Sequence, residues 1–266
     1  MLKINFSLKF LPLATLLFFS NSYADSFEVT SDILYFNYRE FNTSGSLLDK
    51  ETGFIPGVGF KYSTKYKNSD VTAYISHHDG QIDYAGKTQS GRAHTTRTNQ
   101  ILIKYGILLT SQETPDFPAR LLFSFAYHTW DRDILSTTNV QGLHEFYSWH
   151  EFSLGLRFQG ETIDDSFYWT NISALLIYNP EIVVFLDTGD KSLNIGENLG
   201  FRLHAGKTWQ IENRHSISLS FKSEYFEFER SNTIFVNSFF GRSVFITEPD
   251  SASFHNSFNL TLSYRF

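Results

Sequence analysis

Cysteine is absent from all 266 residues, which excludes disulfide bonds and cysteine-based metal sites. After residue 24, no charge-free apolar stretch approaches the ~20 residues that a membrane-spanning helix needs. Basic residues are also in deficit, with 22 Lys and Arg against 28 Asp and Glu, and the net charge of −6 predicts no nucleic-acid partner. Glycine-rich phosphate loops and internal repeats are missing as well, so we expect no cofactor and no metal.

The first 24 residues have the pattern of a secretory signal peptide. Lys3 and Lys9 provide the positive charge, residues 10–19 are apolar, and Ala24 ends a short segment typical of a cleavage site. We therefore expect cleavage after Ala24 and export of the rest of the chain. The predicted organisation is a signal peptide at 1–24 and a single domain at 25–266.

The last eleven residues alternate strictly between polar and apolar. Phe258, Leu260, Leu262, Tyr264 and Phe266 are apolar, and every residue between them is polar. Successive side chains of a strand point to opposite faces, so this segment predicts a strand with one apolar and one polar face. The pattern resembles the C-terminal assembly signal of bacterial outer-membrane β-barrel proteins. That resemblance implies a Gram-negative outer membrane, contact with its lipid and lipopolysaccharide, and the barrel-assembly machinery and periplasmic chaperones as partners.

The rest of the chain divides into ten amphipathic stretches, which predict an all-β, transmembrane, antiparallel up-and-down barrel. The 28 Phe and 14 Tyr suit strands and the aromatic girdles of such a barrel. Short connections alternate with mostly longer ones, as expected for periplasmic turns and external loops. The predicted strands are 27–41, 53–66, 70–85, 94–109, 119–135, 143–158, 166–178, 195–210, 215–230 and 254–266.

Two apolar segments lie in the external connections, at 181–187 and 234–247. They could extend strands above the membrane, fold inward as a plug, or add two strands to make a barrel of twelve. We favour ten, because twelve would need a very short strand and would place the tight 211–214 turn outside.

The polar face of the predicted strands would line the lumen and carry charges of both signs. Such charges are close together and poorly hydrated, so we expect them to pair. A salt-bridged, filled interior and a narrow polar pore both remain open, because ten strands lie between filled and open barrels. The predicted lumen residues are Lys61, Lys104, Glu151, Arg157, Arg202, His204, Lys222, Glu224 and Arg265.

Acidic and histidine residues gather where the strands would reach the outer rim. A ten-stranded barrel with such a rim is similar to the omptins, outer-membrane proteases that activate water with an Asp pair and an Asp–His pair. The similarity is architectural. If the protein is an enzyme, this similarity implies that the catalytic residues are His128, Asp131, Asp133 and His144. The simpler interpretation is solvated charges that bind divalent cations and lipopolysaccharide phosphates. The other rim candidates are His77, His78, Asp79, Glu145, Glu227 and Glu229.

Two functions from different classes follow. The first is a non-enzymatic, porin-like barrel for surface binding or small-solute permeation. The second is an omptin-like rim hydrolase, acting on protein or lipid. A continuous lumen would favour the pore, and a His–carboxylate pair in a water-filled cleft would favour the hydrolase.

Overall fold

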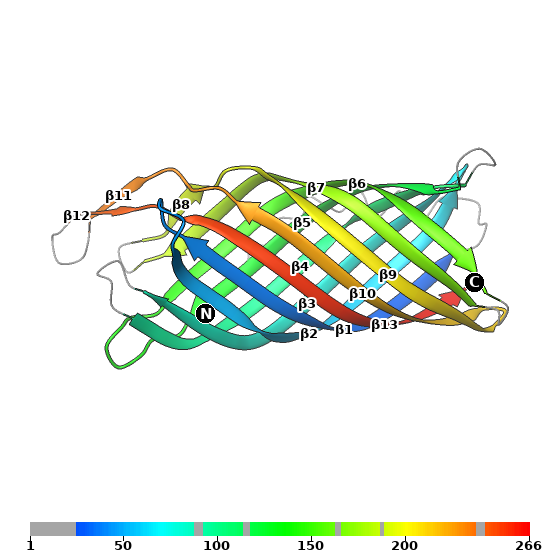
Figure 1. Ribbon diagram of the computed structural model, residues 1–266, viewed down its shortest axis with the longest axis horizontal. Coiled ribbons are helices and arrows are strands. Elements are labelled where there is room, and N and C mark those ends of the chain that lie inside the picture. Colours follow the sequence, from blue (N-terminus) through cyan, green and yellow to red (C-terminus); the bar gives the residue numbers. More distant parts are fainter. Residues whose placement is uncertain (1–24, 88–92, 114–117, 163–165, 187–188, 238–242) are drawn as a thin grey trace.

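The computed structural model describes residues 25–87, 93–113, 118–162, 166–186, 189–237 and 243–266; the predicted signal peptide and its cleavage site lie outside them. Ten long strands form one closed antiparallel barrel (Figure 1). They are β1 (Ser26–Phe41), β2 (Leu47–Tyr66), β3 (Ser69–Lys87), β4 (Ala93–Ser111), β5 (Arg120–Ile134), β6 (Leu143–Glu161), β7 (Ser166–Phe185), β9 (Asn198–Glu212), β10 (His215–Phe228) and β13 (Asp250–Arg265). Three short strands are β8 (Lys191–Asn194), β11 (Ile234–Asn237) and β12 (Ser243–Ile246). No helix among the described residues has the length and apolarity to span a membrane.

Each barrel strand pairs with its neighbour in the chain, and β1 pairs with β13 to close the ring. Ser26 lies opposite Arg265 in that pairing, so the first and last strands begin and end at the same end of the barrel. We call it the terminal end. The opposite end, which carries β8, β11 and β12, is the loop end (Figure 1). The ten-stranded prediction is therefore confirmed and the twelve-stranded alternative is wrong.

The two apolar external segments extend the loop end instead of adding barrel strands. Strand β7 continues to Phe185 and pairs there with β8, after a register shift opposite Asn179, which has a positive φ of 49°. Strands β11 and β12 form a separate two-stranded sheet. The expected loop at 42–52 is also shorter, because β2 already begins at Leu47 and the Asn42 side chain closes the turn on the Ser44 and Ser46 amides.

The outward face of the barrel carries an apolar belt bounded by two sets of aromatic residues. Near the terminal end, Phe27 contacts Phe60 and Tyr264 contacts Phe266, at ring distances of 6.2 and 5.1 Å. Nearer the loop end, another set contains the pairs Tyr35–Phe54 and Tyr105–Tyr127, at 5.3 and 5.5 Å. We call these sets the lower and upper girdles. Between them, outward residues such as Leu154 and Phe258 are 64% and 69% exposed, as suits a surface that faces lipid.

Beyond the upper girdle the polarity of the two faces is reversed. Along β1, the outward residues change from Ile33 and Tyr35 to Asn37 and Arg39, while the inward residues change from polar to Leu34, Phe36 and Tyr38. Along β5, the outward series passes from Phe125 and Tyr127 to Thr129, Asp131 and Asp133, and the inward series reaches Trp130. The terminal half thus has an apolar exterior, and the loop half is built like a water-soluble barrel with an apolar interior.

That interior is the hydrophobic core of the molecule. Trp130, Tyr147 and Trp149 are at most 3% exposed, and the Trp130 and Tyr147 rings stack at 4.4 Å. Each such side chain stabilises the fold by roughly 1.5–3 kcal/mol through burial. The prediction that the polar face of each strand lines the lumen is therefore wrong for the loop half. The core comprises Leu34, Phe36, Tyr38, Ile55, Ile82, Trp130, Tyr147, Trp149, Ile177, Ile182, Val184, Leu193, Ile195, Phe226 and Phe228.

Candidate functional site

The middle of the lumen is crossed by a network of ion pairs. Arg202 on β9 places Nη2 2.7 Å from both carboxylate oxygens of Glu151 on β6, and 2.5 Å from Glu224 on β10. Lys104 lies 3.0 Å from Glu151, and Lys222 lies 2.9 Å from Glu224. These groups come from strands that are not all neighbours, so the network braces the barrel across its interior.

The other predicted lumen residues lie nearer the terminal end. Lys61 pairs with Glu28 at 3.1 Å, and His204 contacts the Ser220 hydroxyl at 3.1 Å. The Arg157 guanidinium packs over the Trp169 ring at 5.0 Å. Arg265 is at the terminal mouth, where it is exposed.

Within the described part of the chain, the exposure of the lumen side chains decreases from the terminal end inward. The side-chain exposure of the charged residues falls from 39% at Lys61 to 25% at Lys222, 13% at Arg202 and 2% at Glu151. The core above them is at most 6% exposed. Among the described residues, the interior is therefore a cup that opens at the terminal end and is closed at the loop end.

Above the core, a second charged cluster surrounds Arg132, which is 1% exposed. Its guanidinium lies 2.5 Å from Glu51, 2.6 Å from Glu145 and 2.9 Å from Glu40. The same guanidinium is 3.5 Å from Asp49. Glu248, just before β13, accepts a hydrogen bond of 2.6 Å from Tyr147 and completes the cluster, which we call the Arg132 cluster.

The Arg132 cluster holds five carboxyl groups and one guanidinium, so full ionisation would leave a large buried negative charge. It lies beyond the upper girdle, since Arg132 follows Tyr127 by five residues along β5. Burial raises the pKa of the Glu51 carboxyl to about 7, against the opposing effect of Arg132. Burial likewise raises the pKa values of Asp49, Glu145 and Glu248. These groups are at most 7% exposed, so in this conformation they do not face a substrate.

The structure divides the predicted catalytic residues between the two faces of the barrel wall. His128 points inward and contacts Glu151 at 3.1 Å. Asp131 and His144 meet at 2.9 Å on the outward face, each more than a third exposed, and Asp133 accepts a bond from Asn99 nearby. His128 is thus separated from the other three. The Asp131–His144 pair could polarise a water molecule, but it lies on the outer wall.

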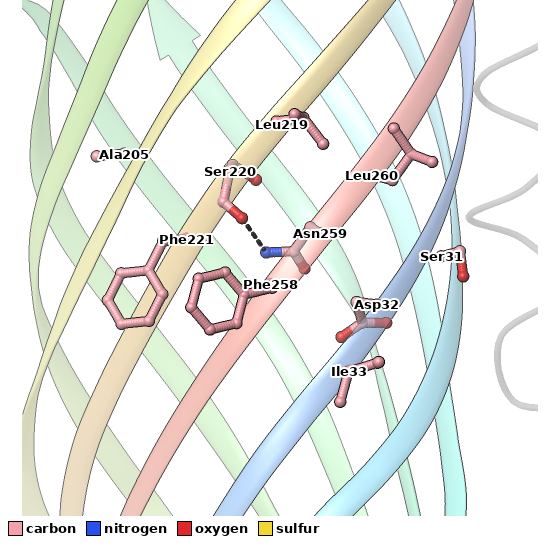
Figure 2. A pocket seen from close by; sticks show the side chains of 10 residues that line it. All are labelled: Ser31, Asp32, Ile33, Ala205, Leu219, Ser220, Phe221, Phe258, Asn259 and Leu260. Atoms are coloured by element: carbon pink, nitrogen blue, oxygen red, sulfur yellow. Dashed lines mark hydrogen bonds between the residues drawn. The ribbon is translucent and has the colours of Figure 1, made fainter.

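A hollow of about 500 Å³ indents the belt over β1, β13, β10 and β9 (Figure 2). Apolar residues dominate its edge, including Ile33, Leu260 and the rings of Phe221 and Phe258, whose centroids are 5.1 Å apart. Asp32 also lines the hollow, and its Oδ2 lies 2.7 Å from Nε2 of His78 inside the barrel. The hollow therefore suits an acyl chain better than a polar substrate.

The Arg132 cluster was not predicted as a site from the sequence. The alternation along β5 does indicate its position: Arg132 is four residues after the inward His128, so its side chain also points inward. Glu40 and Glu51 follow the same rule on β1 and β2. What the sequence alone did not provide is the barrel closure that brings these strands around one guanidinium.

No known protein family matches this chain, and no curated protein sequence is similar to it. Solved structures share the fold. The outer-membrane protease OmpT from Escherichia coli superposes with a TM-score of 0.56 at 8% identity, over 91% of this chain and 97% of that one. The beta domain of the Bordetella autotransporter BrkA gives 0.44 at 10% identity, over 91% and 100%. Neisserial surface protein A gives 0.37 at 7% identity, over 90% and 97%. At these identities the similarity extends to the barrel fold alone.

Proposed function

We propose that this protein is an outer-membrane β-barrel that acts at the cell surface through its loop end and conducts no solute through its lumen. The observation that carries the proposal is the sealed interior. Arg202 joins Glu151 to Glu224 across the middle, and a core of at most 6% exposure lies above them. A pore needs a continuous polar path, which this packing interrupts.

The apolar belt and the girdles support membrane insertion, because lipid is the medium in which exposed Phe and Leu are stable. The five residues of the proposed C-terminal assembly signal, including Phe258 and Phe266, have the parity of the outward face of β13. In this proposal residues 1–24 direct export, and the loop end faces the outside of the cell. The barrel would then lie among outer-membrane lipid and lipopolysaccharide. The assembly machinery and periplasmic chaperones would be its partners during insertion.

The β11–β12 hairpin is the part of the loop end best suited to a surface contact. It extends away from the barrel sheet (Figure 1). Ile234 and Ile246 pack against the core, while the Phe235 and Phe245 rings meet edge to face at 5.4 Å and remain 56% and 68% exposed. Exposed paired aromatics of this kind are typical of interaction sites.

The test is single-channel recording of the refolded chain, without residues 1–24, in a planar bilayer. We expect a folded barrel that gives no discrete openings. Stable openings whose ion selectivity changes in Arg202→Gln would show conduction through the lumen and overturn the proposal. Arg39→Gln, on the outward face, serves as the matched control.

The omptin-like hydrolase is the second candidate, and the Asp131–His144 contact of 2.9 Å is the observation that favours it. Purified barrel would be incubated with casein and, separately, with lipopolysaccharide. Activity that is lost in Asp131→Asn and kept in Asp133→Asn would support a site at this pair. Activity unchanged in both variants, or absent from the parent protein, would reject it.

A further inference from the structure

A small cavity of about 50 Å³ lies inside the barrel between the mid-lumen network and the core. Lys104, Lys222 and Glu224 border it from the network side, and Trp149 and Phe226 border it from the core side. Three histidines also line it: His78, His128 and His255. A cavity of this volume accepts one or two water-sized species.

Two buried nitrogen atoms of the lining have no partner within the described part of the chain. They are Nε1 of Trp149 and Nε2 of His255. Trp149 is 3% exposed and His255 is 8% exposed, so bulk water does not satisfy them. The two rings are held in place, since Trp149 stacks on His128 at 4.6 Å and His255 lies 4.7 Å from the Phe36 ring. An unpaired buried donor costs about 1–3 kcal/mol, which a bound species could offset.

Among the lining groups that can act in one role only, donors outnumber acceptors. The indole of Trp149 and the ammonium groups of Lys104 and Lys222 only donate. Glu224, the carboxylate of the lining, already accepts from Arg202 and Lys222. The network as a whole has three cations, Arg202 and the two lysines, against the carboxylates of Glu151 and Glu224. The remaining carboxylate nearby, Asp32, contacts His78.

We infer that this cavity binds a small monovalent anion of halide size. Such an ion accepts a hydrogen bond from the Trp149 indole and, in the tautomer that carries the proton on Nε2, from His255. It also balances the third cation of the network. It would enter from the terminal end, where the exposed fraction of Lys222 shows that solvent approaches the cavity. Multicarbon anions such as gluconate exceed the available volume.

The experiment measures urea unfolding of the refolded barrel in lipid vesicles, in sodium chloride or sodium bromide against sodium gluconate at equal ionic strength. We expect both halides to raise the unfolding midpoint in a saturable manner, because a ligand that binds only the folded state stabilises it. Trp149→Phe should weaken the halide affinity about tenfold or more, since one hydrogen bond to a charged group is lost. Trp169→Phe is the matched control, because its indole donates to Thr208 instead.

The second readout is the quenching of tryptophan fluorescence by bromide. Trp149 is shielded from collisional quenchers, so bound bromide should quench part of the fluorescence with a saturable dependence that Trp149→Phe removes. Equal midpoints in chloride and gluconate, with no saturable bromide quenching, would mean that the cavity holds only water and would overturn the inference.

Discussion

Arg202 reaches across β7 to Glu151, with Nη2 2.7 Å from each carboxylate oxygen. Replacing it in Arg202→Met would leave Glu151 and Glu224 partly unpaired in a buried site. We expect the free energy of unfolding to fall by about 3–5 kcal/mol, as for other broken buried pairs. Urea titration in vesicles, followed by tryptophan fluorescence, measures it.

Lys61→Met provides the comparison, because the Lys61–Glu28 pair is much more exposed and should contribute about 1 kcal/mol or less. Equal losses in the two variants would contradict a bracing role for Arg202.

Gly57 lies against the Asp32–His78 pair. A Cβ at this position would overlap the His78 ring and lie 2.6 Å from Asp32 Oδ1. Gly57→Ala should therefore separate the pair and cost about 1–3 kcal/mol of stability. Gly160→Ala is the matched change, since a Cβ there meets nothing within 4 Å, and it should be nearly neutral. A neutral Gly57→Ala would show that the pair is not needed.

The Arg132 cluster should make stability depend on pH. The folded-state pKa of Glu51 is about 7 against an ordinary value of 4.5, so folded protein keeps a proton that unfolded protein has lost in this window. This contribution, on the order of 3 kcal/mol, is complete below about pH 4.5 and is lost as pH rises through 7. The urea midpoint should thus be higher at pH 5 than at pH 8. Glu51→Gln should reduce that difference, and an undiminished difference would locate the effect elsewhere.

Leu154 lies midway along the outward face of β6 and is 64% exposed. If the belt faces hydrocarbon, Leu154→Arg should destabilise the inserted barrel by about 2–4 kcal/mol. Gln81→Arg, outward but beyond the belt, should change stability by less than about 1 kcal/mol. Refolding yield and the urea midpoint in vesicles test both variants. Equal effects of the two substitutions would contradict a belt that faces hydrocarbon.

The ten strands could be predicted because alternation with a period of two is local. It also placed Glu151, Arg202 and Glu224 on the inward face, and Glu224 lies opposite Arg202 in the register. The same period separates His128 from Asp131 and Asp133. Grouping them by nearness in sequence ignored that parity.

The two regions of the interior that the sequence analysis did not anticipate depend on non-local geometry. Phe36 and Trp130 meet at 5.4 Å from strands β1 and β5, which are not neighbours. Glu40 on β1 and Glu51 on β2 reach Arg132 on β5 for the same reason, whereas Glu145 lies opposite Arg132 on the adjacent strand. Such distances depend on how the sheet curves and closes, and the sequence of a single strand does not determine that.

The reversal of polarity at the upper girdle fixes how deep the barrel sits. A shift of the barrel along the membrane normal would move Arg39 or Asp131 into hydrocarbon in one direction, and would expose Ile33 or Phe125 to water in the other. Both shifts cost free energy, so the vertical position has a single minimum. In the proposed orientation the loop half then stands above the lipid, and the depth of the barrel sets the height of the β11–β12 hairpin over the cell surface.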